Sequence, residues 1–370
     1  MRRVGRRVAA STAALGLLAG CILENPGYDP IAASASTGVS AGSGLMSAGT
    51  GSTDDATAAT SGASGTGGTS GTSGTSDASA TSGTATGETS GETSGTTGDL
   101  DGPDLCGIPA GAWKFVGVAP LDTINTNEHE GDPVLSADGH VLYFIREGDV
   151  WRATRAGPGE AFGAPELDTQ LGLNTTAPES KLSFSADELA VYMATERQGG
   201  VGGYDVWRLT RSDVGAAFSE PALVDDVNSD KHDFDPHVSG DELRLYHAPY
   251  LGEKQEIVVS TRDAVDQPFS PPTPLMGVNS PAGDADPALS EDELVIVFSS
   301  ARSGVNNLYV AVRPSLDAAF LEPEPLTGIN DPDAADGDPY VAATPLGCEL
   351  FFASKRVNGL GDLYRVEITE

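Results

Sequence analysis

Pairs of acidic residues recur between positions 130 and 338, and side chains of this type can bind a cation or cleave a glycosidic bond. In each pair one residue separates the two acids, and Pro follows the second acid. The pairs are Glu130 with Asp132, Asp233 with Asp235, Asp284 with Asp286, and Asp336 with Asp338. Carboxylates held close together need a counter-charge, which suits a hard cation such as Ca²⁺ or a cationic ligand. Two carboxylic acids flanking one bond are the requirement of glycoside hydrolysis.

A structural role competes with these functional ones. Each acid can instead accept hydrogen bonds from the turn amides at the start of its own strand. Positions shared by all repeats usually serve the common unit, which favours this structural interpretation. The second repeat departs from the pattern, because Ala177-Pro178-Glu179 stands in that place. No unique Glu motif is present to donate a proton, so we expect no catalysis. The alternative is a glycan- or cation-binding propeller, or a glycoside hydrolase, that uses these acids where they converge on one mouth of the central channel.

The acids belong to a unit that recurs five times. A typical unit begins Asp132-Pro133-Val134-Leu135-Ser136 and continues with a tight turn and a second strand, Val141–Phe144. A third strand follows at Asp149–Trp151, and a fourth segment containing Pro runs from Phe162 to Leu167. Four strands per unit, at a period of about fifty residues, are the signature of propeller blades. Aromatic residues at equivalent third-strand positions are expected in the blade core; they are Trp151, Trp207, Tyr309 and Tyr364.

The two ends of the chain predict how the ring closes. The fifth unit stops at Glu370, after its third strand, and lacks a fourth. Residues 113 to 121 match the aromatic, Pro and Leu spacing of the fourth segments. We therefore expect an all-β, five-bladed β-propeller at 104–370 whose N-terminal strand completes the last blade, an arrangement that removes two open strand edges.

The repeat resembles a known family. It resembles the WD40-like repeat of TolB-type propellers, and the resemblance is best seen from Ser185 to Trp207. The pattern is Asp-Pro-x-apolar-Ser-x-Asp, then Leu-Tyr-Phe, then Arg-x-Gly-Gly with Gly-Tyr-Asp-Val-Trp. The resemblance covers 113–370. It implies a periplasmic or surface module that binds other envelope proteins and has no catalytic activity of its own.

Cys106 and Cys348 both belong to the fifth blade. Cys106 leads into the strand donated from the N-terminus, and Cys348 precedes the second strand of the same blade. In an exported domain, two such cysteines form a reasonable disulfide. Two buried free thiols are the alternative, because sequence alone does not prove a pairing.

The N-terminus carries an export signal. Arg2, Arg3, Arg6 and Arg7 precede a short apolar run that ends in Leu18-Ala19-Gly20-Cys21. This sequence is too short for a membrane span. The four last residues resemble the lipobox of bacterial lipoproteins, which implies removal of residues 1–20 and acylation of Cys21. An ordinary secretory signal is the alternative. Ile22 follows the cysteine where Asp would imply retention, so the resemblance favours the outer membrane over the inner one.

A low-complexity segment separates the anchor from the propeller. Residues 32 to 99 are almost entirely Gly, Ser, Thr and Ala, and such a composition buries too little apolar surface to fold. We expect 21–103 to be a disordered linker that tethers the propeller to the cell envelope, facing either the periplasm or the medium. The membrane would then be contacted through the lipid alone.

Charge and motifs exclude several classes of partner and enzyme. Residues 104 to 370 hold 17 Lys and Arg against 45 Asp and Glu, a net charge of 17 − 45 = −28. This argues against nucleic acid and for a basic patch on a partner of an otherwise monomeric propeller. The five histidines lack zinc-ligand spacing. There is no Gly-x-Ser-x-Gly or phosphate-binding loop, and no cofactor is expected other than the Ca²⁺ considered above.

Overall fold

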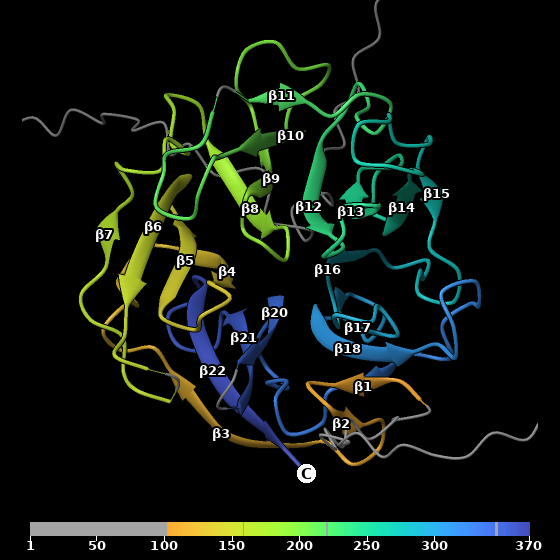
Figure 1. Ribbon diagram of the computed structural model, residues 1–370. Coiled ribbons are helices and arrows are strands. Elements are labelled where there is room, and N and C mark those ends of the chain that lie inside the picture. The colour runs from red at the N-terminus through yellow and green to blue at the C-terminus, as the bar shows by residue number, and fades with distance from the viewer. Residues whose placement is uncertain (1–101, 158, 220, 345–346) are drawn as a thin grey trace, which may run out of the picture. The chain divides into compact units, whose positions relative to one another are not determined.

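The computed structural model describes residues 102–370 except 158, 220 and 345–346. Within that part of the chain every regular element is a β-strand (Figure 1). No helix there is long and apolar enough to span a membrane. The predicted signal at 1–20, the lipidation site Cys21 and the linker up to residue 101 lie outside the described residues.

Five four-stranded antiparallel sheets surround a common centre, which confirms the five-bladed propeller (Figure 1). The first strands of the blades lie nearest to the centre: β4 (Glu130–Leu135), β8 (Glu179–Phe184), β12 (Asp233–Val238), β16 (Asp284–Leu289) and β20 (Asp336–Thr344). The second strands are β5 (Val141–Arg146), β9 (Ala190–Thr195), β13 (Arg244–Pro249), β17 (Val295–Ser300) and β21 (Gly347–Ser354). The third strands are β6 (Asp149–Thr154), β10 (Asp205–Thr210), β14 (Val258–Thr261), β18 (Asn307–Val312) and β22 (Asp362–Thr369).

The ring closes as the sequence predicted. The fourth strand of the last blade is β3 (Lys114–Pro120), which lies antiparallel to β22 at the other end of the chain (Figure 1). Phe115 lies opposite Ile368 and Pro120 opposite Tyr364. The first and last strands of the domain thus belong to one sheet, so neither leaves an open edge at the junction.

The outer strands of the other blades are shorter than expected. They are two-residue segments: β7 (Glu166–Leu167), β11 (Ala222–Leu223), β15 (Thr273–Pro274) and β19 (Glu324–Pro325). Pro lacks the N–H that a ladder needs, and each segment contains or follows one. The aromatic residue ahead of each strand is buried instead, as for Phe162 and Phe269. The Arg that directly follows the third strand lies over this ring, and the guanidinium of Arg262 is 4.2 Å from the ring centre of Phe269.

The hydrophobic core lies between neighbouring blades. Val134 and Tyr143 of the first blade share one buried cluster with Leu182 and Met193 of the second. Each blade therefore buries its apolar face only against its neighbours, as expected of a repeat architecture. The predicted third-strand aromatics belong to this core, and Trp207, for example, is only 6% exposed.

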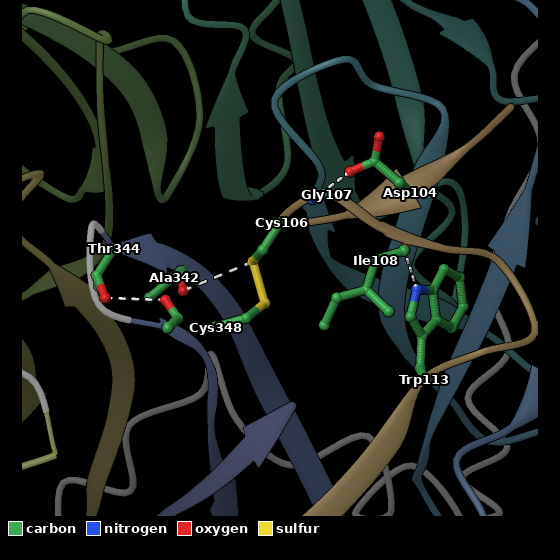
Figure 2. Close-up of a disulfide and its surroundings, with 9 residues drawn as sticks. Asp104, Cys106, Gly107, Ile108, Trp113, Ala342, Thr344 and Cys348 are labelled. Atoms are coloured by element: carbon green, nitrogen blue, oxygen red, sulfur yellow. Dashed lines mark hydrogen bonds between the residues drawn. A yellow bond between two sulfur atoms is a disulfide. The ribbon is translucent and has the colours of Figure 1, made fainter. Parts of the chain in front are cut away.

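A small hairpin precedes the propeller and is joined to the last blade. It consists of β1 (Asp104–Leu105) and β2 (Ile108–Pro109), with Cys106 between them. Cys106 is bonded to Cys348, with the Cα atoms 5.8 Å apart (Figure 2). The indole N–H of Trp113 donates a 2.6 Å hydrogen bond to the carbonyl of Ile108. A covalent bond thus fixes the hairpin to the beginning of β21.

Candidate functional site

A bulge near the beginning of each first strand determines where the acids point. The register of the β4–β5 pair shifts between Gly131 and Val134, and the other four blades have the same shift. The second acid of each pair lies in the left-handed backbone region, with φ from 50° to 57° for Asp132, Asp235, Asp286 and Asp338. The bulge interrupts the strict alternation of side chains, so the two acids of a pair have different surroundings.

The bulge also aligns the second blade. Glu179 begins β8 as Glu130 begins β4, so Glu179 is equivalent to the first acid of a pair. Lys181 then occupies the position that Asp132 has in the first blade. The sequence interpretation had aligned Glu179 with the second acid, two residues away. In the second blade, the position of the second acid is therefore occupied by a buried lysine.

The first acids stabilise their own blades. Glu130 is fully buried; it accepts a 2.6 Å hydrogen bond from the Thr126 hydroxyl and a 2.8 Å bond from Arg146. The guanidinium of Arg146 lies 4.4 Å from the ring of Trp151. The same acid–Arg pair recurs as Asp284 with Arg302 at 2.7 Å and Asp336 with Arg356 at 2.6 Å. In the third blade a buried His247 lies 3.9 Å from Asp233.

The second acids join each blade to the next. The N–H of Lys181 donates to Asp132 Oδ2 at 3.1 Å, and the N–H of Asp286 donates to Asp235 Oδ2 at 3.4 Å. In the same way, the N–H of Asp338 donates to the carboxylate of Asp286. Across the closure of the ring, the N–H of Asp132 donates to the carboxylate of Asp338. Because Lys181 has no carboxylate, this bond has no counterpart between the second and third blades. The first acids thus hold turns before their own strands, as the structural interpretation predicted. The second acids differ from it, because they accept from the next blade rather than from their own turn.

The five equivalent side chains form what we call the acidic ring: Asp132, Lys181, Asp235, Asp286 and Asp338. All are at most 8% exposed. Carboxylate oxygens of Asp132, Asp235 and Asp286 lie within 4.8 Å of one another, the one such group of three among the described residues. The Nζ of Lys181 and the Oδ1 of Asp338 are buried without a hydrogen-bond partner.

The ring concentrates negative charge in a low-dielectric environment. Burial raises the pKa of Asp132 to about 6, although Lys181 opposes the shift. Burial and then a neighbouring carboxylate raise the pKa values of Asp235 and Asp338 well above the usual range. Burial alone would lower the pKa of Lys181, but the four carboxylates together raise it. The ring thus holds four carboxyl groups against one amino group, and its acids lie close enough to influence one another.

A cavity of about 830 Å³ opens where the first strands end. Its lining includes apolar side chains and five acids, but neither Lys nor Arg. The apolar residues are Leu105, Leu135, Phe184, Val238, Leu289, Tyr340 and Val341. The acids are Asp104, Glu188, Glu291, Asp292 and Glu293. We call this site the acidic mouth. Sequence reasoning missed this site. Asp104 reaches it only through the β1–β2 hairpin, which the sequence did not predict.

Most of these acids are held by the fold. Glu293 pairs with Arg244, and Glu188 accepts from the N–H of Ala137 and contacts Arg211. Asp292 accepts from the N–H of Leu294 within its turn. The exposed Glu291 adds a further charge at the rim. Hydrogen bonds or ion pairs thus hold several of these acids in place, and two of them, Glu188 and Glu293, already have an Arg partner.

Glu179 gives a pH-dependent prediction. Burial raises its pKa to about 7, although Thr175 and Arg197 oppose the shift. Between about pH 4.3, the ordinary pKa of Glu, and pH 7, the folded protein keeps this proton while the unfolded chain has lost it. Stability from this group is present at low pH and is lost as the pH rises through 7. We expect Glu179→Gln to become progressively more stabilising, relative to the wild type, from pH 4.5 to 7.5.

Urea unfolding of both proteins across that range measures this difference. Glu160→Gln, at an exposed position, is the control for the change of side-chain charge. A constant difference for Glu179→Gln would contradict the predicted titration.

No family model matches the chain, and no curated protein does. Solved structures share the propeller fold. A protein assigned as TolB from Agrobacterium tumefaciens is 18% identical, with a TM-score of 0.42 over 64% of this chain and 76% of that one. An endo-arabinase from Bacteroides thetaiotaomicron is 14% identical, with a TM-score of 0.47 over 70% and 98%.

A xylan β-1,4-xylosidase from Bacillus halodurans is 14% identical, with a TM-score of 0.45 over 64% of this chain. This chain spans 52% of the xylosidase, about half its length. These likenesses, all with TM-scores below 0.5, assign the chain no activity.

Proposed function

We propose that this protein is a lipid-anchored component of the bacterial cell envelope whose propeller binds a partner protein and catalyses no reaction. The observation that carries the proposal is the use of the candidate catalytic acids within the fold. The first acids pair with Arg or hold turns, and the second acids bond the next blade. An acid used in this way is not available to a substrate.

The alternative of a glycoside hydrolase has less geometric support. Inverting enzymes hold their two carboxyl groups about 6.5–9.5 Å apart, and retaining enzymes hold them about 5–5.5 Å apart. In the acidic ring three carboxylate oxygens lie within 4.8 Å of one another, and the side chains are almost fully buried. This arrangement leaves no room for a sugar between the acids, whereas it does allow a small ion.

The acidic mouth is the proposed partner surface. Its lining includes the half-buried apolar side chains of Phe184, Tyr340 and Val341, and its five acids are accompanied by no Lys or Arg. Complementary charge speeds encounter and excludes unsuitable partners, while burial of apolar side chains provides affinity. The surface therefore suits a segment of an envelope protein that carries basic side chains beside an apolar one.

Site-specific photo-crosslinking in intact cells tests this proposal. The photo-reactive residue is placed at Ala186 or Glu291 on the rim, and at Asp213, an exposed residue outside the mouth, as the matched control. We expect one envelope protein to be recovered reproducibly from the two rim positions and not from Asp213. Recovery of glycan alone, or the same proteins from all three positions, would overturn the proposal.

The anchor has its own test. We expect Cys21→Ser to move the mature protein from the membrane fraction to the soluble fraction, because a thiol is needed for acylation. Fractionation of cells followed by immunoblotting measures this. A variant that remains in the membrane fraction would show that another segment or a bound partner provides the attachment.

A further inference from the structure

The acidic ring holds two buried polar atoms that the fold leaves without a partner. The Nζ of Lys181, on a residue only 3% exposed, has no hydrogen-bond partner. The Oδ1 of Asp338, on a residue 1% exposed, also has none. A buried polar group without a partner is costly, and native structures usually satisfy it with a water or a ligand. Both atoms therefore point to an occupant of the ring.

Lys181 does not itself neutralise the ring. No carboxylate oxygen among the described residues lies within ion-pairing distance of its ammonium, although all four acids of the ring influence it. Four carboxyl groups thus face a single amino group within the ring. The counter-charge that such close carboxylates require is thus incomplete. One divalent cation would supply the missing counter-charge.

The geometry of three carboxylates fits such a cation. Oxygens of Asp132, Asp235 and Asp286 lie within 4.8 Å of one another. Two oxygens on opposite sides of Ca²⁺ are about 4.6–5.2 Å apart, since each Ca–O distance is about 2.3–2.6 Å, and Ca²⁺ accepts irregular coordination. One oxygen of each carboxylate is already held by a backbone N–H of the next blade. Such outer hydrogen bonds orient a carboxylate for metal binding.

We propose that the acidic ring binds one Ca²⁺ ion through Asp132, Asp235 and Asp286. Waters on the ion donate to Asp338, and a further water accepts from Lys181. The ion joins the first, third and fourth blades. It therefore spans the second blade, where Lys181 interrupts the hydrogen bonds that link the second acids of successive blades, and it stabilises the centre of the propeller. This inference is independent of the proposed partner binding.

Lys181 gives the proposal a distinctive prediction. An ammonium close to a divalent cation repels it, so Lys181 weakens binding. We expect Lys181→Gln, which removes the charge and keeps a polar side chain, to tighten Ca²⁺ binding at least tenfold. Asp286→Asn, which removes a ligand charge, should weaken it at least tenfold. Asp266→Asn, at an exposed acid remote from the ring in sequence and outside it, should change it little.

The experiment is calorimetric titration of the full mature protein with CaCl₂ after EDTA treatment, accompanied by thermal melts with and without Ca²⁺. The expected result is one ion per chain, and a melting midpoint that rises with Ca²⁺ because only the folded state binds it. Absence of both heat and shift at millimolar Ca²⁺ would overturn the proposal. Binding by Asp286→Asn equal to the wild type, or weaker binding by Lys181→Gln, would also overturn it. If Asp286→Asn does not fold, the Lys181→Gln titration decides the question.

Discussion

Replacing both Cys106 and Cys348 by Ser is expected to lower the free energy of unfolding by about 4 kcal/mol. The bond joins residues 242 positions apart, so it closes almost the whole propeller into one loop. A longer loop loses more entropy when the unfolded chain is crosslinked, and losses of 2–5 kcal/mol are typical of native disulfides. For a domain of this size, such a loss lowers the melting midpoint by roughly 8–16 °C.

Two comparisons isolate the bond. The wild type melted in excess reductant should behave as the double Ser variant does, while the double variant should not respond to reductant. Leu105 packs in the buried cluster that also contains Cys348 and Leu350, so the hairpin retains some contacts when the bond is absent. A double variant as stable as the oxidised wild type would show that those contacts alone hold the hairpin and close the ring.

Loss of the disulfide should also weaken partner binding if the acidic mouth is the binding surface. Asp104, Leu105 and Cys106 all line the mouth, and the bond fixes them to the last blade (Figure 2). A mobile hairpin would add an entropic cost to any complex formed there. The covalent bond thus connects the stability of the ring with the shape of the proposed binding surface.

The propeller was predictable because its signals are local and periodic. Asp-Pro anchors, tight turns and short apolar strands recur at a nearly constant spacing. The last unit lacks a fourth strand, and residues 113–121 supply one extra strand before the first unit. The closing pair of β3 and β22 followed from that count. A repeat reveals its architecture because every copy has the same fold to specify.

The centre of the ring was less predictable. Lys181 lacks the Asp-Pro anchor, so matching by acid type placed the second blade two residues out of register, and only the bulge revealed the equivalence. The roles of the acids depend on partners that are distant in sequence, such as Asp132 and Asp338 across the ring closure. The β1–β2 hairpin has two-residue strands, which are too short to show a periodic pattern.

The acid–Arg pairs of the blades should contribute far more to stability than ion pairs on the surface. Glu130 and Arg146 form a 2.8 Å pair whose side chains are 0% and 7% exposed. Removing one member of a buried pair leaves the other charge uncompensated, which typically costs about 3–5 kcal/mol. We therefore expect Glu130→Ala to lower the free energy of unfolding by about 4 kcal/mol.

The pair of Arg152 with Glu166 in the same blade is the matched control. Its nitrogen and oxygen are 2.5 Å apart, but the Glu166 side chain is 62% exposed. An exposed pair contributes at most about 1 kcal/mol, so Glu166→Ala should have little effect. Urea unfolding of both variants measures the contrast, and equal losses would contradict the structural role assigned to the first acids.

A double variant and a titration extend the test of Glu130. In Glu130→Leu/Arg146→Met both charges are removed, so part of the stability lost in Glu130→Ala should return, because no unpaired charge remains buried. Glu130 bonds Thr126 and Arg146 and lies outside the group of three oxygens formed by Asp132, Asp235 and Asp286. The folded Glu130→Ala protein should therefore bind Ca²⁺ as the wild type does. A large loss of Ca²⁺ affinity in that variant would place the first acids in the ion site and remove the distinction between the two acids of each pair.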